Sequence, residues 1–200
     1  SAALKENTTG HSNVAVGTNA LDANTTGIRN NAFGYEALSA NTTANDNNAF
    51  GYFSLKNTTT GANNSAFGRA TLENNTTGAQ NTAIGFKAMQ ITTSGSNNTA
   101  LGAFSLDANT TGSNNVAIGR DALGSNTTSN NNTAVGYQSS ISNTTGTLNV
   151  AVGFQALDTN STGSNIVAIG ANALDANTTA NNNTAVGYHS LLSNTTGTQN

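Results

Sequence analysis

The chain has 200 residues and a formal net charge of -3, with 8% charged and 35% hydrophobic residues. Soluble domains usually hold about 25% charged and about 45–50% apolar residues, so an ordinary globular core is not expected. Asparagine and threonine fill the difference and are the two commonest residues of the chain. Cysteine and proline are absent, which excludes disulfides and thiolate metal sites. No apolar run reaches the roughly 18 residues of a membrane-spanning helix, so we expect no membrane insertion by this segment.

A 17-residue unit repeats along the chain without insertion or deletion. The repeat is clearest at the pair formed by a large apolar residue and glycine, which runs from Val16-Gly17 to Val186-Gly187. An unbroken period of this kind is not expected of a disordered Asn/Thr tract, and it is typical of a repeat architecture. Alanine precedes the pair in every copy, at Ala15, Ala32, Ala49, Ala66, Ala83, Ala100, Ala117, Ala134, Ala151, Ala168 and Ala185.

The elements of one unit follow each other in a fixed order. The first is a leucine column that starts at Leu4 and is broken only at Ser140, with one methionine replacing leucine elsewhere. Next comes a Thr-Thr pair, usually followed by glycine, which predicts a tight corner. Residues 13–16, Asn-Val-Ala-Val, alternate and include β-branched side chains, which predicts a strand. Gly17 then predicts the next corner.

These elements predict an all-β fold. Helix-turn-helix repeats need roughly 30 residues or more, whereas the shorter unit of this chain suits one coil of a parallel β-solenoid with two or three short strands. We therefore expect about twelve coils in a single continuous domain over residues 1–200. Equivalent residues would stack about 4.8 Å apart, and the Asn and Thr columns would form hydrogen-bonded ladders along the rod. The pattern starts and stops within a unit, which suggests a segment of a longer fibre.

Two assignments remain open for the faces of the strand. In the favoured one, the large apolar column of Val16 faces the interior together with the Leu4 column. Ala15 and its ten equivalents then face outward and permit close approach of another chain. In the other, alanine fills a cramped interior and the large residues form the contact surface. Both predict self-association through an apolar strip. We expect the eleven alanines to make the contact of a homotrimer or a filament.

The strand motif carries a family resemblance. Residues 115–119, Asn-Val-Ala-Ile-Gly, and residues 149–153, Asn-Val-Ala-Val-Gly, resemble the head repeat of YadA-like trimeric autotransporter adhesins. They are also similar to the Asn/Thr/Gly-rich repeats of phage and large-virus tail-fibre proteins. The resemblance covers essentially the whole chain and implies a left-handed parallel β-roll, a trimer and an adhesive role. The unit is longer here because of an added Asn-Thr-Thr-Gly corner, and anchoring and receptor do not carry over.

The sequence offers little for catalysis, metals or nucleic acid. His11 and His189 are about ten units apart, so they cannot share a site. Asp158 and Asp175 occupy one column in successive units and could share a Ca²⁺ ion, but a solvated pair is the simpler interpretation. The same column holds Lys5 elsewhere, so a continuous metal ladder fails. We expect no enzyme activity, no cofactor and no metal, and the six dispersed cations predict no nucleic-acid partner.

The position after the strand glycine is often aromatic. It holds tyrosine at Tyr35 and Tyr52 but Thr18 and Ala103 in other units. Such a column either covers a corner or forms a binding stripe, and the more frequent case is the covered corner.

Three function classes are compatible with this pattern. The leading hypothesis is an extracellular structural or adhesive fibre segment, at a cell surface or on a virion fibre, that attaches to cells, matrix ligands, surfaces or other fibres. An ice-binding solenoid is the alternative, since regular Thr columns could order water. However, Thr8 and Thr9 would face opposite ways in a strand. A polysaccharide-cleaving fibre enzyme should show clustered carboxylates that break the repeat, and none are seen.

Overall fold

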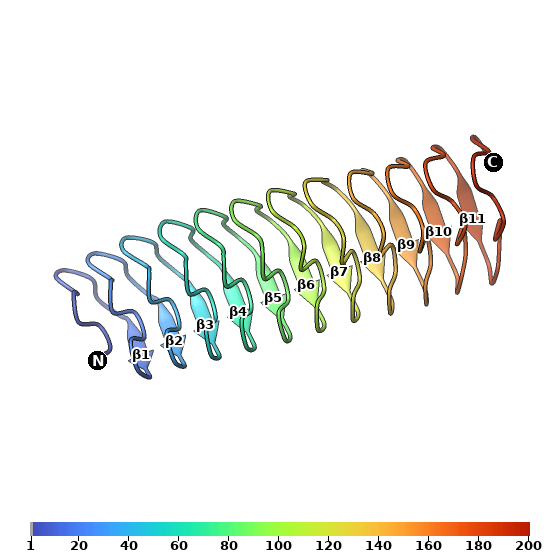
Figure 1. Ribbon diagram of the computed structural model, residues 1–200. Helices are drawn as coiled ribbons and strands as arrows, with labels where there is room; N and C mark the ends of the chain where they lie inside the picture. The colour runs from blue at the N-terminus through green and yellow to red at the C-terminus, as the bar shows by residue number, and fades with distance from the viewer. Residues whose placement is uncertain (1) are drawn as a thin grey trace.

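A computed structural model describes residues 2–200 and confirms the parallel β-solenoid. The coils stack into a rod with the two termini at opposite ends (Figure 1). Eleven strands form one sheet in sequence order, and every neighbouring pair is parallel. The described residues include no helix that is long and apolar enough to cross a membrane. The strands are β1 (Val14–Val16), β2 (Asn31–Phe33), β3 (Asn48–Phe50), β4 (Ser65–Phe67), β5 (Thr82–Ile84), β6 (Thr99–Leu101), β7 (Val116–Ile118), β8 (Thr133–Val135), β9 (Val150–Val152), β10 (Val167–Ile169) and β11 (Thr184–Val186).

The register follows the repeat without a slip. Ala15 pairs with Ala32 between β1 and β2, and Ala168 pairs with Ala185 between β10 and β11. All strand partners therefore lie one repeat unit apart, as the sequence period predicts. Coil-to-coil pairing continues outside the strands, where Leu21 N–H donates to the carbonyl oxygen of Ala37 at 3.0 Å. Stacking thus extends around the whole coil and not only along the strands.

Each coil contains one three-residue strand, so the expectation of two or three strands per coil was wrong. The reason lies in the backbone of the remaining residues. In the coil that contains β2, left-handed φ angles occur at Arg29 (57°), Glu36 (52°) and Leu38 (53°), in addition to Gly34 (142°). Each left-handed residue turns the chain sharply, which leaves no room for a second extended segment. The leucine column itself is left-handed throughout, although glycine is the usual residue for this conformation.

The favoured assignment of the strand faces was also wrong. The alanine column points into the coil, and Ala32, Ala117 and Ala168 are fully buried. The residues of the Val16 column point outward, and Val16 itself is 55% exposed. The alanine and leucine columns pack together in the same buried apolar clusters, and the large residues of the Val16 column lie outside them. The eleven alanines, Ala15, Ala32, Ala49, Ala66, Ala83, Ala100, Ala117, Ala134, Ala151, Ala168 and Ala185, therefore belong to the interior and cannot provide an outer contact.

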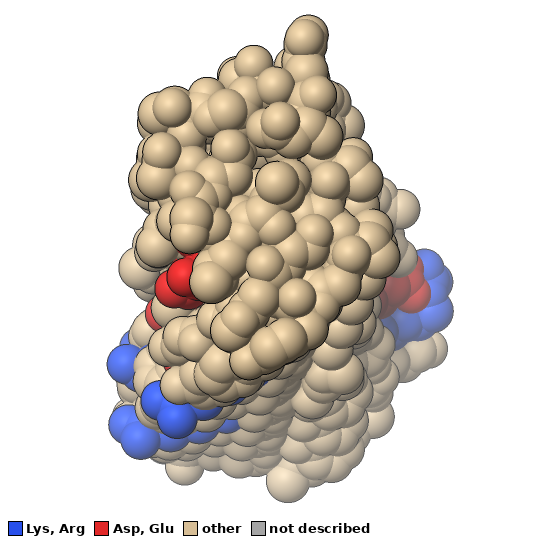
Figure 2. Space-filling model, turned by 90° about the vertical axis from the view of Figure 1, so that its right-hand side faces the viewer, with Lys and Arg blue, Asp and Glu red and all other residues tan. Residues whose placement is uncertain are grey.

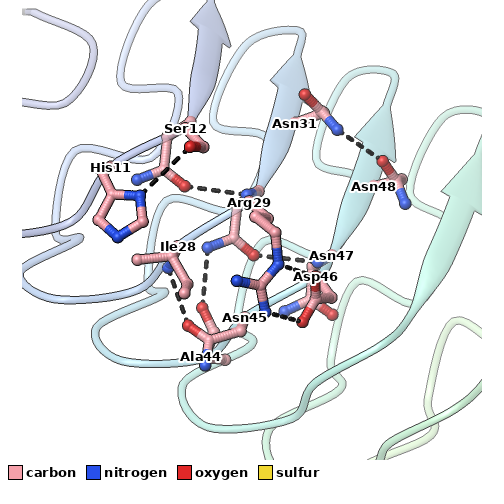
Figure 3. Close-up of polar contacts among 12 residues, drawn as sticks. His11, Ser12, Ile28, Arg29, Asn31, Ala44, Asn45, Asp46, Asn47 and Asn48 are labelled. Carbon is pink, nitrogen blue, oxygen red and sulfur yellow. Dashed lines mark hydrogen bonds and ion pairs between the residues drawn. The ribbon is translucent and has the colours of Figure 1, made fainter.

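Polar ladders run beside the apolar interior, as predicted. Asn30 is buried; its side-chain oxygen accepts from Asn47 N–H at 3.0 Å, and its amide donates to the Ala44 carbonyl oxygen at 2.8 Å. In a second ladder, the Asn41 amide donates to the side-chain oxygen of Asn24 at 2.8 Å. On the outward side of β2 and β3, the Asn31 amide donates to the side-chain oxygen of Asn48 at 2.8 Å (Figure 3). Because buried amides are costly unless bonded, these ladders also fix the register.

One coil interrupts the apolar interior. Ser140 occupies the leucine column with 1% exposure, and its hydroxyl finds no hydrogen-bond partner among the described residues. The neighbouring Ile141 is only half-buried, so it does not replace the missing leucine. The buried apolar residues consequently form two clusters, one ending at Ala134 and the other beginning at Ala151.

Candidate functional site

The outward face of the sheet is an uncharged, partly apolar surface. Each strand presents two outward side chains, and no Lys, Arg, Asp or Glu occupies any of these positions on the eleven strands. Leu101 is 44% exposed and Val186 is 66% exposed. Phe50 stacks between Phe33 and Phe67, with ring centroids 4.7 and 4.9 Å apart. We call this surface the strand face.

A second feature lies at the corners that follow β2 to β6, directly after the glycine that ends each of these strands. Seven residues at these corners form what we call the corner strip. Tyr35 and Tyr52 stack with centroids 5.3 Å apart. The Arg69 guanidinium lies 5.7 Å from the Tyr52 ring and 5.7 Å from the Phe86 ring. Two further aromatic contacts widen the strip, from Tyr52 to its neighbour Phe53 and from Phe86 to Phe104. The members are Tyr35, Tyr52, Phe53, Arg69, Phe86, Lys87 and Phe104.

The corner strip departs from what the repeat needs. The column directly after the strand glycine holds small residues at Thr18, Ala103 and Ala171, so the fold accepts small residues at this corner. Most aromatic residues of the chain, including all but one of the phenylalanines, nevertheless fall between positions 33 and 104. Tyr52 is 43% exposed and Phe86 is 36% exposed. The sequence alone does not decide whether this column covers a corner or binds a ligand, and the structure adds the cations that lie among the rings.

Most cations of the chain are neutralised by a neighbouring carboxylate. The ion pairs are Lys5–Glu6, Arg29–Asp46, Lys56–Glu36 and Arg120–Asp121, at 2.6 to 3.2 Å. Figure 3 shows the Arg29 guanidinium directed at the Asp46 carboxylate of the next coil. Seen along the rod, the charges gather at two edges of the molecule (Figure 2).

The ion pair between Lys56 and Glu36 shifts the pKa of both members. The hydrogen bond from Lys56 lowers the pKa of Glu36, and the same contact raises the pKa of Lys56. The remaining cations are Arg69 and Lys87, which form no ion pair with any described carboxylate. Both lie over the ring of Phe86, with the Lys87 nitrogen at 5.5 Å. The corner strip therefore holds the two cations that form no ion pair within the described chain.

The carboxylate column brings Asp158 and Asp175 close enough for their charges to interact. Burial raises the pKa of Asp158, and the charge of Asp175 raises it further. Burial likewise raises the pKa of Asp107. No group of three or more His, Cys, Asp or Glu residues that could hold a metal ion occurs in the part of the chain that the structure describes. His11 contacts Ser12, and His189 stacks on Tyr188 at the other end of the rod.

The two threonine columns have different environments. The hydroxyl of Thr25 donates to the carbonyl oxygen of Thr42 at 3.0 Å, so the first column is used within the ladder. The second column, which runs from Thr9 to Thr196 with one serine at Ser94, is exposed in every coil. The position two residues further along holds different residue types from coil to coil, so a single exposed hydroxyl row results. A row of this kind presents regularly spaced hydroxyls in one dimension only.

No family model, curated protein or solved structure matches this chain. The resemblance to YadA-like heads and to tail-fibre repeats therefore stays a prediction. The described residues enclose no pocket, so the strand face and the corner strip are the candidate sites, and both are open surfaces.

Proposed function

We propose that this chain is a rigid structural and adhesive segment of an extracellular fibre, carried on a cell surface or a virion and without catalytic activity. The observation that supports this most is the unbroken stack, in which successive coils pair in register along the whole rod. A rod of this construction holds its ends apart and presents the same surface in each coil. The absence of a pocket among the described residues favours extended partners over small substrates.

We further propose that copies of the chain associate side by side through the strand face. Eleven strands spaced about 4.8 Å apart and three residues wide give a footprint of about 500 Å² before side-chain relief is counted. Side-chain relief enlarges this footprint toward the roughly 800 Å² that each partner contributes to a stable interface, and the corner strip stays outside it. An exposed patch of this size that carries no charge is often a functional surface. A homotrimer closed by rotational symmetry would bury the same face of every copy.

The test is molar mass in solution, measured by light scattering at micromolar concentration. We expect three times the 20.1 kDa of one chain. Replacing Ile118 and Val135, which neighbour each other on β7 and β8, with glutamate should release monomers. The matched control places glutamate at Thr128 and Thr145, in the exposed threonine row of two successive coils. A stable, folded wild-type monomer would refute the association, and the rod-like role would then be judged from small-angle scattering alone.

Ice binding remains the second candidate because one threonine row is exposed along the whole rod. The candidate is weaker than the fibre role, since the column two residues further along is not regularly threonine and a two-dimensional match to ice is missing. Measurement of thermal hysteresis decides between the two functions, and we expect no hysteresis. Ice binding would be favoured by a clear hysteresis that is lost when Thr111 and Thr128 are changed to bulky residues.

A further inference from the structure

We propose that the corner strip binds an acidic polysaccharide, that is, a linear chain of sugars that carry carboxylate or sulfate groups. This inference rests on the adhesive part of the proposed function and assigns it a place and a ligand class. The place is the corner after strands β2 to β6, where seven aromatic and cationic residues line one flank of the rod.

The first argument is charge. The protein is acidic overall, at -3, so it has no general attraction for polyanions. Arg69 and Lys87 are the two cations without a carboxylate partner among the described residues, and they lie in successive coils. Their charges are therefore available to an incoming anion. A guanidinium beside an aromatic ring keeps its edge free, and that edge can take a carboxylate or a sulfate through two parallel hydrogen bonds.

The second argument is the aromatic surface around the two cations. Tyr35 is 41% exposed and Tyr52 is 43% exposed, and coils with alanine at this corner show that packing does not require them. Aromatic rings offer large contact areas at a low cost in conformational entropy. The C–H groups of a sugar ring are apolar and suit such a surface, whereas a free inorganic anion would gain nothing from it. The combination of rings and cations thus selects a ligand with both apolar and anionic parts.

The third argument is shape. The described residues enclose no pocket, and the corner strip follows the rod over five coils, about 24 Å at the spacing of stacked strands. A single sugar would be poorly held on so open a surface. A polymer can contact several coils at once, and the repeated weak contacts then raise the overall affinity.

The experiment measures binding of the assembled wild-type protein to heparin, hyaluronan and neutral dextran by isothermal titration calorimetry. Heparin carries sulfates and carboxylates, hyaluronan carries carboxylates only, and dextran carries neither. We expect binding to at least one acidic polymer, weakening with added salt, and none to dextran. In the variant with Arg69→Gln and Lys87→Gln, affinity should fall about tenfold or more, since two charge-assisted contacts are removed.

The matched control changes Arg29→Gln and Arg120→Gln, which removes two cations that already have carboxylate partners. Its affinity should stay near that of the wild type. Phe86→Leu, which removes the ring beneath both cations, should weaken binding while the circular dichroism spectrum stays unchanged. Three results would overturn the proposal. They are absence of binding to both acidic polymers, an equal loss of affinity in the two double variants, and equally tight binding of single-stranded DNA. The molar mass and the rod shape would be unaffected by that failure, so the fibre role is tested separately.

Discussion

Replacing Ser140 with leucine should stabilise the rod, because this position is a defect in an otherwise continuous leucine column. Its backbone φ of 51° lies within the range of the leucines one coil away, 50° at Leu123 and 56° at Leu157. A leucine can therefore enter without a change of backbone. Losing a buried leucine typically costs about 2–5 kcal/mol, and an unsatisfied buried hydroxyl costs about 1–3 kcal/mol. Since serine already fills part of the space, we expect a gain of about 2–4 kcal/mol.

The gain should appear in two measurements. Thermal unfolding followed by circular dichroism should shift upward by about 5–15 °C if the rod unfolds cooperatively. Native-state hydrogen exchange should show that the wild type is least protected around Ser140 and that Ser140→Leu joins the two apolar clusters into one protected block. Ser142→Leu is the control, since it adds the same side chain at a half-buried position outside the core. Uniform protection in the wild type, or equal effects of the two variants, would refute the reasoning.

Three further perturbations test the stack. Deleting Ala117 should disrupt its coil and both neighbours, because every strand pairs with its equivalent in the next coil; an unchanged melting temperature would contradict the stacked register. Gly85→Ala should cost at least about 2 kcal/mol, because φ is +134° and the new Cβ would lie 2.6 Å from the Gly102 carbonyl oxygen; chemical denaturation measures the loss. The raised pKa of Asp158 means that the folded state binds its proton more tightly than the unfolded chain, so this carboxyl favours folding below about pH 4 and loses that contribution as pH rises. The Asp158→Asn variant should therefore have a higher melting temperature than the wild type at neutral pH, and the same melting temperature below the ordinary pKa of aspartate. A difference in melting temperature that does not change with pH would show that the effect has another cause.

The sequence predicted the period, the register and the Asn and Thr ladders, because these depend only on equal spacing of like residues. It did not decide which face of the strand points inward. Alternation separates Ala117 from Ile118, but the choice between them depends on the width of the coil interior, which local pattern does not reveal. Leucine in a left-handed conformation was equally hidden, since glycine and asparagine are the residues that normally mark it. For the corner strip, the sequence shows the aromatic column. The role of Arg69 and Lys87 is visible only in the structure, where the other four cations of the chain form ion pairs with carboxylates.

The ladder that builds the rod also determines how it responds to force. The bonds between coils join equivalent positions of successive units, and the termini lie at opposite ends of the stack (Figure 1). Tension applied to the termini thus peels the end coil bond by bond instead of shearing the whole stack. Each detached coil replaces about 4.8 Å of rod with up to roughly 60 Å of extended chain. Under such tension we expect the segment to lengthen in steps of about 55 Å and to dissipate work while the remaining coils stay folded.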